Sequence, residues 1–213
     1  LSDNGKNFTL ISDKSFYFQG KIVRDNLNKI IDFEILDQGQ LFSSKKENLT
    51  GRNIDSESIV RSKSNGFYIS FESNNRVMYH EVLNGPGKFL PKHPDFDKLL
   101  FNDGIEALAI KENGELFAIP ELPPKGKERH PIYRLHNNKW SIIDEIKIDQ
   151  DFKVVDAEMI DDGNLITLER KFSFYDGFKI RLRRIIIEEN NIINSEILLE
   201  SLPWEYYNFE GLS

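Results

Sequence analysis

Acidic side chains recur at two places in each repeat of the sequence. The first set is spaced by 49, 52 and 52 residues and comprises Glu57, Glu106, Glu158 and Glu210. The second set follows a glycine by six to eight residues and comprises Asp13, Glu72, Glu121 and Glu169. Hard divalent cations such as Ca²⁺ bind roughly six to eight oxygen ligands, carboxylates prominent among them. If the fold gathers these acids, they offer cation binding and cation-assisted hydrolysis.

Glycine-containing tripeptides recur with a similar spacing. Three of them lie between runs rich in strand-forming residues, at 64–66 (SNG), 112–114 (ENG) and 161–163 (DDG), and a fourth, DNG, occupies 3–5. Asn-Gly or Asp-Gly between apolar runs is the strongest short-range signal for a β-hairpin. We therefore expect a first-set acid where the first strand of each hairpin begins, and a second-set acid where its second strand ends.

Two more strand-like runs follow each hairpin, for example 131–137 and 140–148 in the third repeat and 178–187 and 192–200 in the fourth. Four short strands in a repeat of about 50 residues are typical of a β-propeller blade. The sequence therefore predicts an all-β fold, a β-propeller of four-stranded blades, with about four blades in one domain over residues 1–213.

The repeats also predict where the units begin and end. The first unit lacks its first strand, and we expect five or six blades in the parent protein, six preferred, so that this chain is truncated at both ends. Trp140 and Trp204 are expected to pack between blades. The predicted units are 1–52, 53–102, 103–154, 155–205 and the start of a fifth at 206–213.

Antiparallel pairing predicts where the acids lie. The start of a first strand and the end of a second strand are neighbours, at the end of the hairpin away from its turn. The first strand of each propeller blade is innermost, so the acids should surround one mouth of the central channel. The expected neighbours are Glu57 with Glu72, Glu106 with Glu121, and Glu158 with Glu169, and the ring is extended by Asp13 and Glu210.

Eight carboxylates in one region raise one another's pKa unless cations or hydrogen bonds compensate. We assign as ligands of Ca²⁺ the first set, Glu57, Glu106, Glu158 and Glu210. We assign to substrate binding the second set and three arginines near it: Asp13, Glu72, Arg76, Glu121, Arg134, Glu169 and Arg170. Ion pairs are expected between Glu72 and Arg76 and between Glu169 and Arg170. A second interpretation is that acids recurring once per blade only join neighbouring blades, through hydrogen bonds from backbone N–H groups.

The composition excludes several classes of function. The formal net charge of −7 argues against nucleic-acid binding, which needs basic patches. The absence of cysteine excludes disulfides, thiol catalysis and zinc–thiolate sites. No apolar run approaches the roughly 18–20 residues that cross a bilayer. Phosphate-cradling loops, zinc-protease motifs, EF-hand loops and nucleophile elbows are all missing, and no organic cofactor is expected.

Several stretches, taken with their order and spacing, resemble one family over nearly the whole chain. The stretches at 102–121 (NDGIEALAIKENGELFAIPE), 152–173 (FKVVDAEMIDDGNLITLERKFS) and 178–185 (FKIRLRRI) are similar to the bacterial phytase-like domain, also called "esterase-like activity of phytase". The resemblance implies a β-propeller in a periplasmic or secreted bacterial protein. It also implies hydrolysis of phosphate or carboxylic esters, with a small-molecule ester or phosphorylated ligand as partner.

Three functions are consistent with these features. The first is a divalent-cation-dependent hydrolase of phosphate or carboxylic esters, with Arg76 or Arg170 pairing with phosphate oxygens. The second is a non-catalytic propeller that binds a ligand or a protein partner. The third is a metal-dependent lactonase-like hydrolase that shares the acidic mouth. No catalytic nucleophile is identified.

Overall fold

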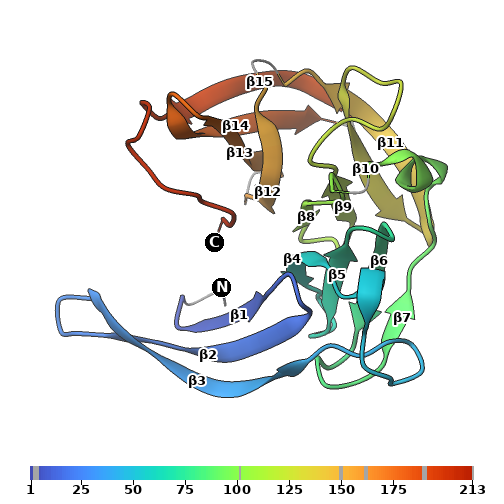
Figure 1. Ribbon diagram of the computed structural model, residues 1–213, viewed down its shortest axis with the longest axis vertical. Helices are drawn as coiled ribbons and strands as arrows, with labels where there is room; N and C mark the ends of the chain where they lie inside the picture. The colour runs from blue at the N-terminus through green and yellow to red at the C-terminus, as the bar shows by residue number, and fades with distance from the viewer. Residues whose placement is uncertain (2–4, 101, 149–150, 161–162, 189–190, 213) are drawn as a thin grey trace.

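Four antiparallel sheets stand around a common centre (Figure 1). The computed structural model describes residues 1, 5–100, 102–148, 151–160, 163–188 and 191–212. Within these residues the first sheet has three strands and each of the next three sheets has four. The predicted β-propeller of four-stranded blades is confirmed, and we call the sheets blades 1 to 4 in chain order.

The strands follow one another outward in each blade. Blade 1 comprises β1 (Asn7–Ile11), β2 (Phe16–Arg24) and β3 (Ile30–Gln40). Blade 2 comprises β4 (Ser56–Arg61), β5 (Phe67–Phe71), β6 (Arg76–His80) and β7 (Gly87–Phe89). Blade 3 comprises β8 (Ala107–Ile110), β9 (Leu116–Ile119), β10 (His130–His136) and β11 (Lys139–Ile146). Blade 4 comprises β12 (Lys153–Met159), β13 (Leu165–Ser173), β14 (Gly177–Glu188) and β15 (Asn191–Glu200).

The innermost strands β1, β4, β8 and β12 contact one another in turn around the centre. Two short 3₁₀ helices, η1 (Gly51–Asn53) and η2 (Pro94–Lys98), lie in the connections between blades. Within the described part of the chain, no helix has the length and hydrophobicity needed to span a membrane.

The hairpin turns between the first two strands of blades 2, 3 and 4 share one pattern of hydrogen bonds. In each, a backbone N–H donates to the carbonyl oxygen four residues later. The residues with left-handed backbone are Asn65, Gly114 and Gly163, which are 49 residues apart. In blade 2 the tripeptide is therefore displaced by one residue, and Asn65 tolerates the positive φ of 68°. Gly66 is needed for another reason, because an added Cβ would lie 2.3 Å from the Tyr79 hydroxyl.

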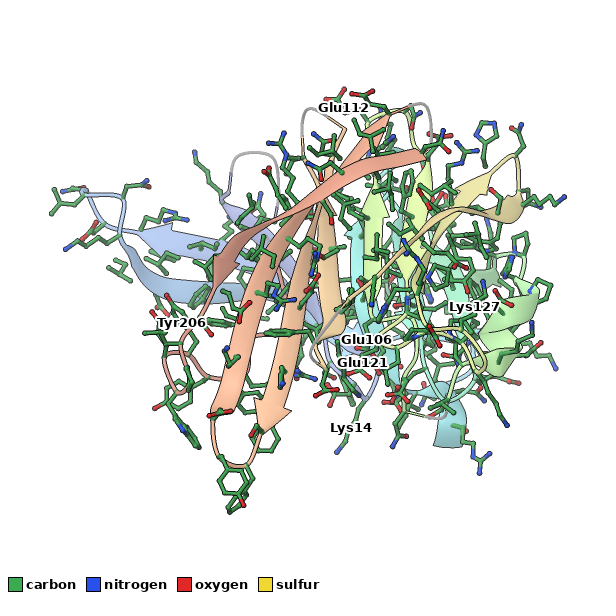
Figure 2. The ribbon with its side chains drawn as sticks, turned by 90° about the horizontal axis from the view of Figure 1, so that it is seen from above. Lys14, Glu106, Glu112, Glu121, Lys127 and Tyr206 are labelled. Atoms are coloured by element: carbon green, nitrogen blue, oxygen red, sulfur yellow. The ribbon has the colours of Figure 1, made fainter. Side chains whose placement is uncertain are left out.

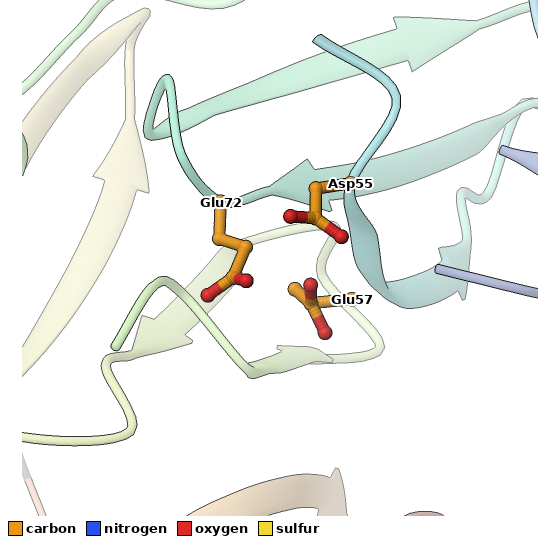
Figure 3. A group of neighbouring side chains, drawn as sticks. All are labelled: Asp55, Glu57 and Glu72. Atoms are coloured by element: carbon orange, nitrogen blue, oxygen red, sulfur yellow. The ribbon is translucent and has the colours of Figure 1, made fainter. Parts of the chain in front are cut away.

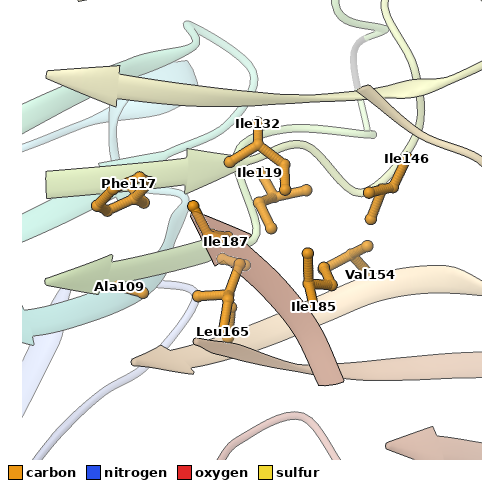
Figure 4. Close-up of a cluster of buried hydrophobic side chains, with 11 residues drawn as sticks. Ala109, Phe117, Ile119, Ile132, Ile146, Val154, Leu165, Ile185 and Ile187 are labelled. Atoms are coloured by element: carbon orange, nitrogen blue, oxygen red, sulfur yellow. The ribbon is translucent and has the colours of Figure 1, made fainter. Parts of the chain in front are cut away.

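Apolar layers between consecutive blades form the core. The layer between blades 3 and 4 includes Ile119, Ile132 and Ile185 (Figure 4). Similar layers lie between blades 1 and 2 and between blades 2 and 3. Trp140 belongs to the last of these layers and is 4 % exposed, as expected. The same expectation is wrong for Trp204, which is 69 % exposed.

Gly104 lies where blades 2 and 3 are packed closely together, and a substitution there tests that packing. A Cβ added there would lie 2.4 Å from the Cβ and 3.1 Å from the Cα of Glu72. We predict that Gly104→Ala forces the blades apart and lowers the free energy of unfolding by about 1–3 kcal/mol, measured by urea denaturation. The control is Gly211→Ala, whose added Cβ would meet its nearest neighbour at 3.9 Å. Equal stability of the two variants would contradict this account of the packing.

Candidate functional site

A cavity of about 320 Å³ lies at the channel mouth, where the inner strands begin. Arg170, Asp55 and Asn102 line it together with the predicted carboxylates. Figure 2 shows two of these acids, Glu106 and Glu121, at one end of the blades. The cavity thus collects most of the acids that the repeat singles out. The predicted carboxylates in its lining are Asp13, Glu57, Glu72, Glu106, Glu121 and Glu210.

Three carboxylates of blade 2 form the tightest group in the cavity. Asp55, Glu57 and Glu72 each offer an oxygen, and these oxygens all lie within 4.8 Å of one another (Figure 3). Antiparallel pairing produces the group, because the backbone N–H of Glu72 donates to the carbonyl oxygen of Asp55 at 2.9 Å. Asp55 was not predicted. The signal that could have found it is an acid two residues before Glu57, at the point where the chain enters the first strand.

Blade 3 repeats this arrangement and joins it to blade 2. The backbone N–H of Glu121 donates to the carbonyl oxygen of Gly104 at 2.9 Å, so that Glu121 occupies the place of Glu72. Glu106, at the start of the first strand of blade 3, shares a side-chain hydrogen bond with Glu57. A hydrogen bond between two carboxyl groups requires a proton on one of them. A carboxyl group from each of two adjacent blades therefore meets the other at the mouth, in an arrangement that favours protonation of one of them.

Burial and crowding disfavour the charged forms of these acids. Burial, with the charge of Asp55 added to it, raises the pKa of Glu57 to about 7. Burial and the neighbouring carboxylates raise the pKa of Glu72 to about 8 and that of Glu106 to about 10. At neutral pH the mouth must therefore hold protons or bind a cation that replaces them.

In blade 4 the acid of the first strand lies elsewhere than expected. The placement of Glu158 at the mouth is wrong, since Glu158 is exposed and pairs across the sheet with Ile166. Val155, which lies 49 residues after Glu106, lines the cavity in its place, and Asp156 follows it at a register irregularity in β12. Burial raises the pKa of Asp156 to about 7, although its carboxylate accepts the backbone N–H of Leu212 at 2.6 Å.

Glu169 also lies away from the cavity. Its side chain is fully buried and accepts hydrogen bonds from Arg183 and, at 3.3 Å, from Arg181 and the Thr167 hydroxyl. The expected ion pair with Arg170 is wrong, because alternation along β13 points the two neighbouring side chains to opposite faces of the sheet. Glu169 therefore pairs with two buried arginines of blade 4 and does not contribute to the cavity.

Two of the three arginines assigned to the substrate lie elsewhere. Arg76 donates to the backbone carbonyls of Asn53 and Asn74 at 2.7 and 3.0 Å. It also stacks on Phe71, so the expected ion pair with Glu72 is wrong. Arg134 lies 3.6 Å from Glu115. Glu115 precedes β9 while Glu121 follows it, which places Arg134 at the end of the blade opposite the mouth.

Arg170 is the assigned arginine that lines the cavity. Its guanidinium donates to Asn208 and Glu210 and lies 3.8 Å from Glu121. Arg170 thus connects blade 4 with the segment after it and places one positive charge among the carboxylates.

Lys153 is a functional candidate that sequence reasoning missed. Its ammonium group lies 3.0 Å from Asp103 and 2.9 Å from Glu121. Burial lowers its pKa, but the hydrogen bonds to these two carboxylates outweigh burial and raise it. Lys153 pairs with Arg170 as Asp55 pairs with Glu72 and Gly104 with Glu121. At this position of the repeat, blade 4 therefore supplies an ammonium group where blade 2 supplies the carboxylate of Asp55.

Some of the same acids also join blades. Glu72 accepts a hydrogen bond from the backbone of Gly104 in blade 3, and Asp156 accepts one from Leu212. The carbonyl oxygen of Glu121 accepts the backbone N–H of Val154 in blade 4 at 3.3 Å, and within blade 3 it contacts Nε2 of the buried His130 at 3.1 Å. These contacts fit the joining interpretation. They leave the group of Asp55, Glu57 and Glu72 with more negative charge than hydrogen bonds within it can offset.

Comparison with known proteins adds a family and a fold. The model of a family described as "Phytase-like: Esterase-like activity of phytase" matches residues 1–213. No curated protein matches the chain. An α-L-arabinofuranosidase from Clostridium thermocellum superimposes with a TM-score of 0.53 at 12 % identity, over 95 % of this chain and 75 % of that one. A GH43 β-1,3-galactosidase solved with galactodeoxynojirimycin superimposes with a TM-score of 0.51 at 8 % identity, over 98 % and 74 %. At such identities the likeness shows the fold alone.

The raised pKa values predict an unusual pH dependence. Protonated Glu57, Glu72 and Glu106 favour the folded state, because their folded-state pKa values lie above the ordinary 4.5. This stabilisation is complete below pH 4.5 and is lost as the pH rises through about 7 to 10. In EDTA, the free energy of unfolding should fall between pH 6 and pH 9, and Glu106→Gln should flatten that fall. A variant that keeps the wild-type slope would contradict the assignment.

Glu169 should be essential to stability. Glu169→Ala leaves Arg181 and Arg183 buried without the carboxylate that they share, and we predict a loss of about 3–5 kcal/mol in the free energy of unfolding. Urea denaturation of Glu169→Ala beside Glu158→Ala measures it. Glu158 is exposed, so its removal should change stability little. Similar losses in both variants would show that the buried network is not what stabilises blade 4.

Proposed function

The chain belongs to the phytase-like family, and from this premise we propose that its channel mouth binds Ca²⁺ and hydrolyses phosphate or carboxylic esters. The family match and the propeller fold support hydrolase chemistry in this cavity. We further propose that the protein works in the periplasm or outside the cell, on a small-molecule ester or a phosphorylated ligand.

One observation carries the proposal: carboxylates from two blades meet with too few cations among them. Asp55, Glu57 and Glu72 approach within 4.8 Å, and the side chain of Glu106 is hydrogen-bonded to Glu57. In the neighbouring pair of blades, Lys153 already supplies a positive charge to Asp103 and Glu121. The blade 2 group has the same kind of acids, with an aspartate at the repeat position of that lysine. A bound cation would replace the protons that now hold these acids together.

The residues present fit Ca²⁺. Two oxygens on opposite sides of a Ca²⁺ ion stand roughly 5 Å apart, because each bond is about 2.3–2.6 Å long. Separations within 4.8 Å satisfy that limit for Asp55, Glu57 and Glu72. The amide of Asn102 lines the same cavity and offers a neutral oxygen. The donor set consists of oxygens alone, which suits a hard cation and not the softer metals that prefer nitrogen or sulfur.

The side chains on the blade 2 side and on the blade 4 side of the cavity have different roles in the proposed reaction. When bound, Ca²⁺ would polarise the ester and acidify a water molecule. Asp55, Glu57 and Glu72 hold the cation on the blade 2 side. Arg170, on the blade 4 side, orients an anionic group of the substrate by charge-assisted hydrogen bonds, in exchange for its present contact with Glu210. Glu121, kept in place by Lys153 and His130, accepts a proton from water at the centre.

Thermal unfolding with EDTA and with Ca²⁺ tests the binding step. Saturating Ca²⁺, at about 100 times its Kd, should raise Tm by roughly 5–10 °C. Glu57→Gln removes a ligand and should lower the affinity for Ca²⁺ at least about tenfold. Glu112→Gln is the matched control, since Glu112 is exposed at the opposite end of the blades (Figure 2). A Tm that ignores Ca²⁺ in the unmodified protein would favour acids that only join blades.

Hydrolysis of p-nitrophenyl phosphate, p-nitrophenyl acetate and a lactone, each with and without Ca²⁺, tests the chemical step. We expect Ca²⁺-dependent turnover of one of the two nitrophenyl esters, and loss of that turnover in Glu57→Gln. Turnover of the lactone alone would indicate a lactonase-like hydrolase. Ca²⁺ binding without turnover of any of the three would indicate a propeller that binds a ligand or a protein partner.

A further inference from the structure

Blade 4 carries a hairpin that extends beyond the channel mouth. Its second strand, β13, has nine residues, whereas the corresponding strands β5 and β9 have five and four. Arg170 lines the cavity, and the strand continues past it to Ser173 before the turn. Figure 2 shows the orange hairpin of β13 and β14 projecting past the level of Glu106 and Glu121. The extension is specific to this blade.

The tip of this hairpin is aromatic and exposed. Phe174 and Tyr175 are 84 % and 87 % exposed. Behind them, Phe172 and Phe178 pair across the two strands with ring centroids 4.9 Å apart. Phe172 stands two residues after Arg170 on the same face of β13, which is roughly 7 Å along the strand. The aromatic surface is therefore continuous with the rim of the cavity.

Trp204 lies against the turn of this hairpin and is held there by two hydrogen bonds. Its backbone N–H donates to the carbonyl oxygen of Asp176 and its indole N–H to that of Tyr175, both at 3.1 Å. The indole covers Gly177, where an added Cβ would lie 2.5 Å from the ring. Trp204 also has a positive φ of 62°, a strained conformation for a bulky residue. Strain of this kind persists where the surroundings enforce it, and it gathers at ligand sites.

Two other roles for the surface fit less well. An additional blade whose second strand is as short as β5 or β9 would end near the mouth and leave the tip uncovered. A membrane surface in contact with the tip would bring the carboxylates of the mouth toward lipid headgroups, which anionic lipids in particular would oppose. The tip is better suited to a ligand that also reaches the mouth.

We propose that Phe172, Phe174, Tyr175 and Trp204 form a platform for a sugar ring. One face of a sugar ring presents C–H groups that pack on aromatic rings, while its hydroxyl groups need polar partners at the edge. Such partners lie beside the platform: Arg170 donates to Asn208 and Glu210, and the amide of Asn208 donates to Glu210 at 2.7 Å. The platform goes beyond the hydrolysis proposed above, because it binds a sugar whether or not the cavity turns over an ester.

Tryptophan fluorescence tests the proposal directly. The chain has two tryptophans, and Trp140 is buried, so Trp140→Phe leaves Trp204 as the single reporter. Titration of this variant with cellotetraose, xylotetraose and arabinotetraose in EDTA should give a saturable change in emission with at least one of them. Phe174→Ala should weaken that binding about tenfold. Phe89→Ala, which removes an exposed aromatic ring on β7, should leave it unchanged.

The outcomes separate this proposal from the hydrolase. Binding that persists in EDTA and in Glu57→Gln supports the platform even if no ester is hydrolysed. The absence of a saturable response to all three saccharides overturns it, and so does an equal loss of affinity in Phe89→Ala. A response to phosphatidylcholine vesicles in place of the saccharides shows that the tip contacts lipid. Urea denaturation of Phe174→Ala confirms that the comparison is made on folded protein.

Discussion

Negative charge concentrated at the inner ends of the blades is the constraint to which the rest of the mouth responds. Apolar layers between the sheets force the first strands together, and antiparallel pairing returns each second strand to the same end. The acids converge because the core requires it, at a cost in desolvation and repulsion. Shared protons, Lys153 and Arg170 each relieve part of that cost, and the relief differs from one blade to the next. Because the compensating groups differ between blades, the cavity has chemically different sides although the blades repeat one another.

Much of this arrangement could be predicted from the spacing of Asn, Gly and acidic residues. The hairpin geometry places Glu57 beside Glu72, and Glu106 near Glu121, without any knowledge of side-chain contacts. In blade 4 the prediction failed because it followed the recurring acid and not the exact 49-residue interval that separates Glu57 from Glu106. The position 49 residues after Glu106 holds Val155, which lines the cavity. Glu158 lies three residues further along the strand and is exposed.

Face and direction account for the other misplacements. Glu169 and Arg170 are neighbours in sequence, and a strand sends neighbours to opposite faces, so that one is buried while the other lines the cavity. Arg134 lies on a strand beside β9 but near its other end. Lys153 gave no signal by itself, because a single lysine before a strand is ordinary, and its role emerges only from the pair of carboxylates that surrounds it.

The carboxyl pair of Glu57 and Glu106 links the binding of a proton to the contact between blades 2 and 3. One member belongs to blade 2 and the other to blade 3, so the proton between them holds the two sheets together at their inner ends. By thermodynamic linkage, any change that separates these two carboxyl groups lowers their affinity for the proton, and deprotonation in turn weakens the contact between blades 2 and 3.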